Sequence, residues 1–260
     1  MSAEPIQLVV CDIDGTLLRG SETAIAPAVF AQVRRLDEKG ILFCPASGRQ
    51  HASMQRLFAG VGVKLPYICE NGGLVFAPGN SGALLGKTPM RRDLAMRLCG
   101  DILAVPDCEL VASGAETSYI CLKHPEFPDY IRSFVGNNVS MISRPEDIPE
   151  DVVKISAYCR QGAAVARTVL APAWQTHFSV AIAGECWLDF TRSDKGRGLR
   201  QLCTALDIPL SAVVAIGDNY NDVPMLSIAA HPYIMDTAAE ELRQRFPNHC
   251  ANAEDVLSRL

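Results

Sequence analysis

The chain has 260 residues, of which 48% are hydrophobic and 20% charged, values typical of a globular protein with enough core for one large domain or two modest ones. A formal net charge of -5 argues against a protein that binds the phosphate backbone of nucleic acids, and no apolar stretch reaches the length of a membrane span. The N-terminal residues lack the basic and apolar regions of a secretory signal, and the ten cysteines are scattered singly, so we expect free thiols and a cytoplasmic location.

The first predicted strand is the apolar run of residues 8–11, which leads into Asp12, Asp14 and the turn residue Gly15. Because side chains alternate along an extended segment, the two aspartates point to the same side. One aspartate in such a place can take up a phosphoryl group as a nucleophile, and a second carboxylate beside it can shuttle a proton. An ordinary Asp-Gly turn after a strand is the alternative interpretation. A calcium-binding EF-hand loop is excluded, since its glycine would stand two positions later and its further acidic ligands are absent.

Two further apolar runs, residues 40–46 and 211–217, predict strands that also end in polar residues. The polar segments that follow them are Ser47-Gly48-Arg49 and Asp218-Asn219-Tyr220-Asn221-Asp222. Continuous apolar strands separated by helical stretches indicate a parallel sheet covered on both faces, which is a Rossmann-like, doubly wound α/β core. Ligands bind such sheets in the crevice beyond the carboxyl ends of the strands, where all three runs place their polar groups.

These polar groups form a coherent chemical set. Carboxylate oxygens can hold a hard divalent cation, for which Mg²⁺ is the natural choice, and the candidates are Asp12, Asp14, Asp218 and Asp222. Ser47 can donate to a phosphoryl oxygen, and we expect the amides that follow it to open a helix and form an anion site. Lys195 supplies a point charge for developing negative charge. Taken singly, Ser47 could equally be a helix N-cap, Asp218 a turn residue and Lys195 a solvated lysine.

The middle of the chain is too long for a loop, because about 145 residues separate the second polar segment from Lys195. Residues 1–87 are predicted to form the first part of the core, with a hairpin near residues 74–86, and residues 188–260 the second part. Residues 88–187 are predicted to form an inserted α+β cap domain, in which we expect the residues that select the substrate. The predicted elements of this domain are a helix at residues 90–103 and strands at residues 109–112, 119–122, 153–159, 179–183 and 186–190.

With these residues assembled, the chain resembles the haloacid dehalogenase-like (HAD) hydrolases, and within them the Cof-type phosphatases of type IIB, which carry a large inserted C2 cap. Four motifs match in the family's order and span nearly the whole chain: Asp12-x-Asp14-Gly-Thr, Ala46-Ser47-Gly48-Arg49, Lys195-Gly196 and Gly217-Asp218-x-x-Asn221-Asp222-x-x-Met225-Leu226. The segment Glu70-Asn71-Gly72-Gly73 also resembles a segment found after the second motif in this subgroup.

The resemblance implies a magnesium-dependent phosphomonoester hydrolase. In the implied mechanism Asp12 attacks phosphorus and becomes an aspartyl phosphate, while Asp14 protonates the leaving oxygen and then deprotonates the hydrolytic water. The implied phosphoryl-binding residues are Ser47, Gly48, Lys195 and Asn221. The implied magnesium ligands are Asp12, Asp218 and the backbone carbonyl of Asp14, with Asp222 either a direct ligand or one layer further out. The presence of Asp14 argues against dehalogenase activity, because the dehalogenases lack this carboxylate.

We expect the substrate to be a small phosphorylated metabolite, with a sugar phosphate as one candidate class. Two alternative functions stay open: a phosphotransferase or phosphomutase of the same superfamily, and a non-catalytic phosphate-binding regulatory module. Such a module would be expected to have lost the nucleophile or the metal-binding aspartates, all of which this chain keeps. A dinucleotide-binding or P-loop enzyme is disfavoured, because neither G-x-G-x-x-G nor G-x-x-x-x-G-K-[ST] follows any predicted strand. The oligomeric state stays open.

Overall fold

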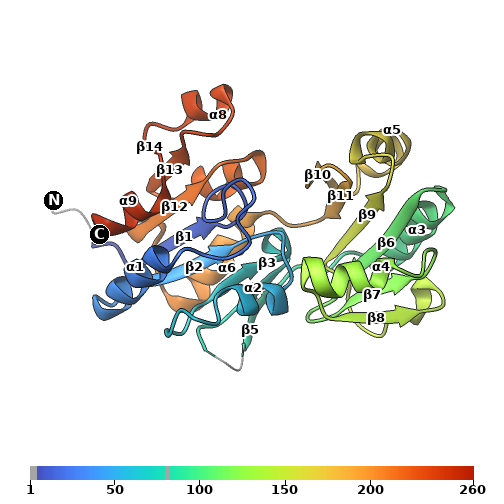
Figure 1. The fold of residues 1–260 in the computed structure, drawn as a ribbon, viewed down its shortest axis with the longest axis horizontal. Helices are drawn as coiled ribbons and strands as arrows, with labels where there is room; N and C mark the ends of the chain where they lie inside the picture. The colour runs from blue at the N-terminus through green and yellow to red at the C-terminus, as the bar shows by residue number, and fades with distance from the viewer. Residues whose placement is uncertain (1–4, 80–81) are drawn as a thin grey trace. The chain divides into compact units, whose positions relative to one another are not determined.

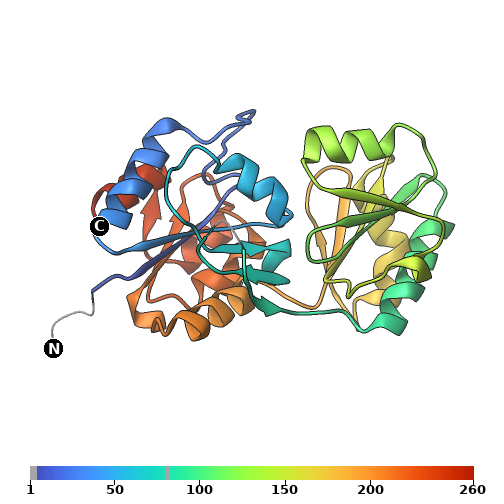
Figure 2. The ribbon, with the colours of Figure 1, turned by 90° about the horizontal axis from the view of Figure 1, so that it is seen from below.

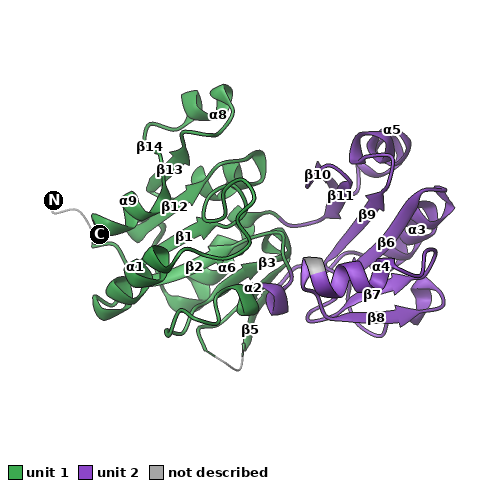
Figure 3. Ribbon diagram, in the orientation of Figure 1, with its two compact units in different colours: residues 1–49, 54–86, 194–260 green, residues 50–53, 87–193 purple. Residues whose placement is uncertain are grey.

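The computed structural model describes residues 5–79 and 82–260, which divide by their internal contacts into two compact units (Figure 3). The core unit comprises residues 1–49, 54–86 and 194–260, and the inserted unit comprises residues 50–53 and 87–193. The fold class predicted from the sequence, a doubly wound α/β core with an α+β insertion, is confirmed. The placement of a functional cap domain at residues 88–187 stays a prediction.

The core unit is built on an eight-stranded sheet with the order β14-β13-β12-β1-β2-β3-β4-β5 (Figure 1). Its strands are β1 (Leu8–Asp12), β2 (Leu42–Ala46), β3 (Tyr67–Cys69), β4 (Leu74–Phe76), β5 (Leu84–Lys87), β12 (Val213–Gly217), β13 (His231–Met235) and β14 (His249–Cys250). The neighbours from β14 to β3 pair in parallel, and β3 pairs with β4 in antiparallel fashion. Because β1 lies between β12 and β2, the carboxyl ends of the three strands that carry the predicted site residues are adjacent.

Helices cover both faces of this sheet, as the continuous burial of side chains along its central strands requires. Figure 2 shows α1 (Pro27–Glu38) and α9 (Ala253–Ser258) on one face and α6 (Lys195–Leu206) on the other. Leu8 and Val10 of β1 pack against Leu199 and Leu202 of α6 in one apolar cluster. The remaining helices of this unit are α7 (Val223–Leu226) and α8 (Glu240–Arg245), and α2 (His51–Leu57) follows β2.

The predicted hairpin corresponds to β4 and β5, which are neighbours in the sheet. The backbone N–H of Ala77 donates to the carbonyl of Ala83 at 2.8 Å, where the two strands approach the turn. Asn80 and Ser81, which we place at the tip of this hairpin from the sequence, lie outside the described residues.

The inserted unit is an α+β structure around a six-stranded sheet with the order β10-β11-β9-β6-β7-β8. Its elements are α3 (Arg92–Ala104), β6 (Cys108–Ser113), β7 (Ser118–Cys121), α4 (Phe127–Tyr130), β8 (Val139–Ile142), β9 (Lys154–Cys159), α5 (Ala163–Trp174), β10 (Ser179–Ile182) and β11 (Trp187–Thr191). The predicted helix and all five predicted strands are therefore present within a few residues. Strand β8 escapes prediction because its residues are only half-buried or exposed, so they lack the apolar run that marks the other strands.

The two faces of the inserted sheet carry separate apolar clusters. Helices α3 and α5 cover one face, where Leu98 and Leu170 pack with Leu110 of β6. Phe127 of α4 packs on the other face against Ile120 of β7. Among the helices in the described part of the chain, none is both long enough and apolar enough to cross a membrane.

Candidate active site

The predicted site residues lie where β1, β2 and β12 end. Asp12 is the last residue of β1, Ser47 directly follows β2, and Asp218 directly follows β12. Lys195 begins helix α6, whose start is fixed by the side chain of Asp194, since this carboxylate accepts a hydrogen bond from the backbone N–H of Arg197 at 2.8 Å. Three adjacent parallel strands and one helix N-terminus thus bring residues from both ends of the sequence together.

Lys195 is fully buried between two carboxylates. Its Nζ donates to Oδ1 of Asp12 and, at 2.6 Å, to Oδ1 of Asp222. Burial disfavours the charged ammonium, but the attraction of Asp12 and Asp222 outweighs it and raises the pKa of Lys195 above its usual value. The solvated-lysine alternative is therefore excluded, and the lysine remains a cation beside the carboxylate of Asp12.

Asp222 connects this lysine to the loop that follows β12. Its Oδ2 accepts hydrogen bonds from the backbone N–H groups of Asp218 and Asn219, both at 3.0 Å, while its Oδ1 accepts from Lys195. Both oxygens of this buried carboxylate are thus engaged by protein donors. Asp222 therefore orients the loop that carries Asp218 and balances the charge of Lys195.

The carboxylates of Asp12, Asp218 and Asp222 fit a divalent cation. One oxygen from each lies within 4.8 Å of the others, and Oδ2 of Asp12 is buried without a hydrogen-bond partner among residues 5–79 and 82–260. Burial, together with the nearby Asp222 carboxylate, raises the pKa of Asp12 and of Asp218, because three carboxylates share a site with a single ammonium. A bound dication would offset this excess of negative charge, and an oxygen-only donor set suits Mg²⁺. The side chain of Asp14 is not a member of this group.

Gly15 lets the carboxylate of Asp218 approach the backbone that follows β1. Its φ of +103° is a conformation that favours glycine, and a Cβ at this position would stand 2.2 Å from Oδ2 of Asp218. The next residue, Thr16, donates from its hydroxyl to Oδ1 of Asp218 at 3.1 Å. The Asp-Gly-Thr segment therefore holds the carboxylate of Asp218 in place. An ordinary Asp-Gly turn, the alternative interpretation, does not explain this contact.

Asp14 belongs to a second polar group, formed with Ser47 and Arg49. Nε of Arg49 donates to Oδ2 of Asp14 at 2.9 Å, and Nη2 donates to Oδ1 at 2.6 Å. The hydroxyl of Ser47 lies 3.4 Å from Oδ2 of Asp14 and accepts from the backbone N–H of Arg49 at 3.2 Å. The hydrogen bond to Asp14 raises the pKa of Arg49. The sequence alone assigns Arg49 no role, although its place two residues after Ser47 at a strand end is the signal that could have identified it.

The backbone after Ser47 differs from the expected helix start. Helix α2 begins only at His51, so the amides of Gly48 and Arg49 lie in a turn that precedes it. The reason is that the carbonyl of Arg49 accepts a hydrogen bond from the backbone N–H of Glu70 at 3.1 Å, which ties this segment to the turn that follows β3. The expectation that these amides open a helix is therefore wrong.

Asn71 is a further residue of the site that sequence reasoning did not assign. It has φ of 52° and ψ of 41°, and Glu70 before it also has φ of 52°, a left-handed conformation that is uncommon for residues other than glycine. Its Oδ1 accepts from Nδ2 of Asn221 at 3.3 Å, and its amide lies against the backbone of Gly48. The Glu70-Asn71-Gly72 sequence is the signal that could have identified Asn71 as a site residue. Asn221 and Gly48, both predicted site residues, are thus joined through Asn71.

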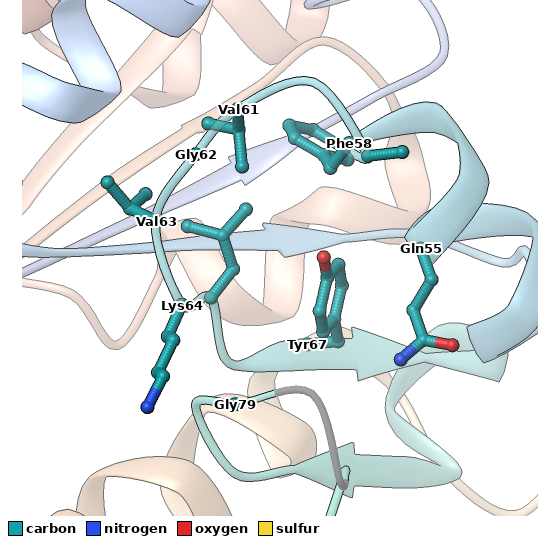
Figure 4. A pocket seen from close by; sticks show the side chains of 10 residues that line it. Gln55, Phe58, Val61, Gly62, Val63, Lys64, Tyr67 and Gly79 are labelled. Atoms are coloured by element: carbon teal, nitrogen blue, oxygen red, sulfur yellow. The ribbon is translucent and has the colours of Figure 1, made fainter.

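A pocket of about 470 Å³ lies elsewhere in the core unit (Figure 4). It is lined by buried Phe58 and Tyr67, by Gln55 and Lys64, by small or apolar residues of the same segment, and by Gly79. Tyr67 is the first residue of β3, at the opposite end of that strand from the site segment that begins with Glu70. None of the predicted site residues lines this pocket.

Comparison with known proteins extends over nearly the whole chain. The family model of haloacid dehalogenase-like hydrolases matches residues 9–256. The 5-amino-6-(5-phospho-D-ribitylamino)uracil phosphatase YbjI of Escherichia coli strain K12 is 25% identical over 243 residues, which cover 90% of this chain and 86% of the relative. The phosphoglycolate phosphatase of Methanopyrus kandleri is 26% identical over 242 residues, 91% of this chain and 87% of the relative. A crystal structure of a protein from Eubacterium rectale superposes with a TM-score of 0.85 at 28% identity and covers 98% of both chains.

Proposed function

The chain belongs to the haloacid dehalogenase-like hydrolase family, and we propose that this phosphatase hydrolyses small phosphomonoesters through a phosphorylated Asp12, with Mg²⁺ as its cofactor. The observation that carries the proposal is the environment of Asp12. Its Oδ1 accepts from the buried ammonium of Lys195, its Oδ2 has no hydrogen-bond partner in the described part of the chain, and the carboxylates of Asp218 and Asp222 lie beside it. A buried carboxylate with one oxygen unengaged, next to a cation and two further carboxylates, supports a nucleophile at a metal-assisted phosphoryl-transfer site.

In the proposed reaction these side chains take the following roles. An oxygen of Asp12 attacks phosphorus while the bond from phosphorus to the ester oxygen breaks, and Asp14 gives its proton to that departing oxygen. Lys195 and Ser47 bind the phosphoryl oxygens, together with Gly48 and Asn221. In the second half Asp14 takes a proton from water, which attacks phosphorus and releases inorganic phosphate and Asp12.

Asp12 and Asp218 would hold the cation, together with the backbone carbonyl of Asp14. When bound, Mg²⁺ supplies positive charge that draws the phosphoryl group and the carboxylates together against their repulsion. In this scheme Asp222 is not a direct ligand of the cation, because both of its oxygens already accept from protein donors. It orients the loop that carries Asp218 and balances the charge of Lys195.

The substrate class is a small phosphorylated metabolite. The names of two relatives, a phosphoribitylaminouracil phosphatase and a phosphoglycolate phosphatase, designate compounds of this class. The first of these compounds carries its phosphate on a sugar-derived chain, so sugar phosphates are the first class to assay. Residues 88–187 are proposed to select among such esters. None of the ten cysteines forms a disulfide bond and nine of them are buried, which supports the proposal that the enzyme works in the reducing cytoplasm.

The experiment compares the wild-type protein with Asp12→Asn. An amide cannot form the acyl phosphate, so we expect turnover to fall on the order of 10⁴-fold or more, measured as phosphate released from a panel of phosphorylated sugars. Rapid quenching with a labelled ester should trap a hydroxylamine-sensitive phosphoprotein in the wild type and none in the variant. EDTA should stop the wild-type reaction, and Mg²⁺ should restore it.

Asp37→Asn is the matched control, because Asp37 is an exposed aspartate on helix α1. It should keep wild-type turnover. Near-wild-type activity of Asp12→Asn would refute the nucleophile, and full activity in a chelated sample would refute the metal. Phosphoryl transfer to a second sugar without release of phosphate would instead identify a phosphotransferase.

A further inference from the structure

Both carboxylate oxygens of Asp14, the proposed proton-transfer residue, already accept hydrogen bonds from Arg49. Oδ1 of Asp14 accepts from Nη2 of Arg49, and Oδ2 accepts both from Nε of Arg49 at 2.9 Å and from the hydroxyl of Ser47 at 3.4 Å. Proton transfer to an ester oxygen needs one of these carboxylate oxygens within hydrogen-bond reach of the substrate. The two-bond contact with Arg49 therefore competes with an ester oxygen for Asp14.

Arg49 is also well placed for a phosphoryl group. A guanidinium presents its N–H donors as a planar fork, which matches a carboxylate and a phosphoryl group equally well. The backbone of Arg49 is bound to the hydroxyl of Ser47 at 3.2 Å, and Ser47 is a proposed phosphoryl-binding residue. The same side chain thus has two competing partners of the same chemistry within one site.

Burial distinguishes the two cations of the site. Lys195 is fully buried and donates to two carboxylates, so its ammonium is fixed in position. The Arg49 side chain is 31% exposed, and that of Asp14 is 52% exposed. An ion pair at such a boundary is held weakly enough to open when a better partner arrives.

We propose that Arg49 exchanges partners during the reaction: it holds Asp14 until a phosphoryl group arrives, then turns its guanidinium to the phosphoryl oxygens and releases Asp14 for proton transfer. This inference rests on the proposed function and deepens it, because it makes Arg49 a phosphate-binding residue and a positioning residue for Asp14. No bond other than hydrogen bonds changes in the exchange. Once released, Asp14 takes up a proton from solvent and gives it to the ester oxygen as that oxygen leaves phosphorus with the bonding electron pair.

A double-mutant cycle on the binding of inorganic phosphate tests the exchange. The proteins are wild type, Arg49→Lys, Asp14→Asn and the double variant, each titrated with inorganic phosphate in the presence of Mg²⁺. Arg49→Lys keeps the charge but loses the fork, and we expect it to weaken phosphate binding about tenfold. Asp14→Asn removes the competing carboxylate, and we expect it to tighten binding about tenfold because Arg49 is released.

The double variant decides between exchange and simple charge repulsion. If Arg49 must leave Asp14 to reach phosphate, most of the tightening caused by Asp14→Asn disappears when residue 49 is lysine. If the carboxylate merely repels phosphate, the tightening persists in full in the Arg49→Lys background, and the exchange is refuted. Unchanged phosphate affinity in the single variant Arg49→Lys also refutes it.

Turnover provides a second readout. We expect Arg49→Lys to raise KM about tenfold for an alkyl phosphate and for p-nitrophenyl phosphate alike, because both present the same phosphoryl group. An arginine that only oriented Asp14 would leave both KM values unchanged and lower kcat for the alkyl ester alone, whose leaving group needs a proton. That result would refute the exchange.

Arg91→Lys is the matched control. Arg91 binds Asp93 in the inserted unit by the same two-bond arrangement, with Nε donating to Oδ1 at 3.0 Å, and it should leave phosphate affinity and KM unchanged. The two proposals fail separately. A wild-type protein that binds phosphate with the expected dependence on Arg49 but hydrolyses no ester refutes the proposed function, whereas an active enzyme indifferent to Arg49→Lys refutes only the exchange.

Discussion

Replacing Lys195 by methionine tests the charge balance on which the site depends. Methionine has nearly the length of lysine and packs in the same space, so the change removes the ammonium and little else. It leaves the carboxylates of Asp12 and Asp222 buried without their shared cation, since Lys195 donates to both. We expect the variant to fold and to be much less stable.

The magnitude follows from burial. Both carboxylates and the lysine have side chains at most 6% exposed, so water cannot replace the lost partner. Removing one member of a buried ion pair costs about 3–5 kcal/mol. For a chain of this size 1 kcal/mol corresponds to roughly 2–4 °C in melting temperature, so the expected fall for Lys195→Met is on the order of 6–20 °C.

Thermal unfolding with and without Mg²⁺ measures this effect. Mg²⁺ should raise the melting temperature of Lys195→Met more than that of the wild type, because the cation compensates carboxylates that have lost their ammonium. The deficit should also shrink from about pH 8 to pH 5, since burial already raises the pKa of Asp12 and a bound proton would replace the missing charge. The control is Lys87→Met, which removes a partly exposed pair with Asp151 and should shift the melting temperature by less than about 2 °C. A Lys195→Met protein that melts with the wild type and gains nothing extra from Mg²⁺ would show that the three charges do not stabilise one another.

Two further changes test local features of the structure. Gly15→Ala should abolish turnover and lower the free energy of unfolding by at least about 2 kcal/mol, because its Cβ would stand 2.2 Å from Oδ2 of Asp218. Gly20 also has a positive φ, of +58°, but nothing within 4 Å of its Cβ position, so Gly20→Ala should cost only about 1 kcal/mol; equal effects of the two in urea unfolding would contradict the contact. Burial lowers the pKa of His51 from 6.5 to about 4, so the unfolded chain takes up a proton before the folded one, and stability present above pH 6.5 is lost as the pH falls. At pH 5 the free energy of unfolding should be about 2 kcal/mol lower than at pH 7 because of His51, and the variant His51→Asn should lack this loss. Identical pH dependence of urea unfolding in wild type and variant would contradict the lowered pKa of His51.

The core architecture was predictable because its signals are local. The apolar runs at residues 8–11, 40–46 and 211–217 became β1, β2 and β12, since continuous apolar strands are stable only between two layers of helices. Parallel pairing then brings their carboxyl ends to one edge, so the convergence of Asp12, Asp218 and the segment after β2 followed from topology alone. Strand β8 was missed because it is an edge strand with little buried surface, and its pairing with β7 depends on the rest of the sheet.

What the sequence by itself determined is therefore the doubly wound core, the inserted α+β region and the identity of the polar residues at the strand ends. Only the tertiary structure decided which of them pair. Lys195 and Asp12 are 183 positions apart, and no local pattern distinguishes a lysine that the sheet will bury from the many that stay in solvent. The contact of Arg49 with Asp14 and the left-handed turn that carries Asn71 to Asn221 likewise depend on neighbouring strands and loops. Burial and charge pairing are properties of the space around a side chain, and that space exists only once distant segments have packed together.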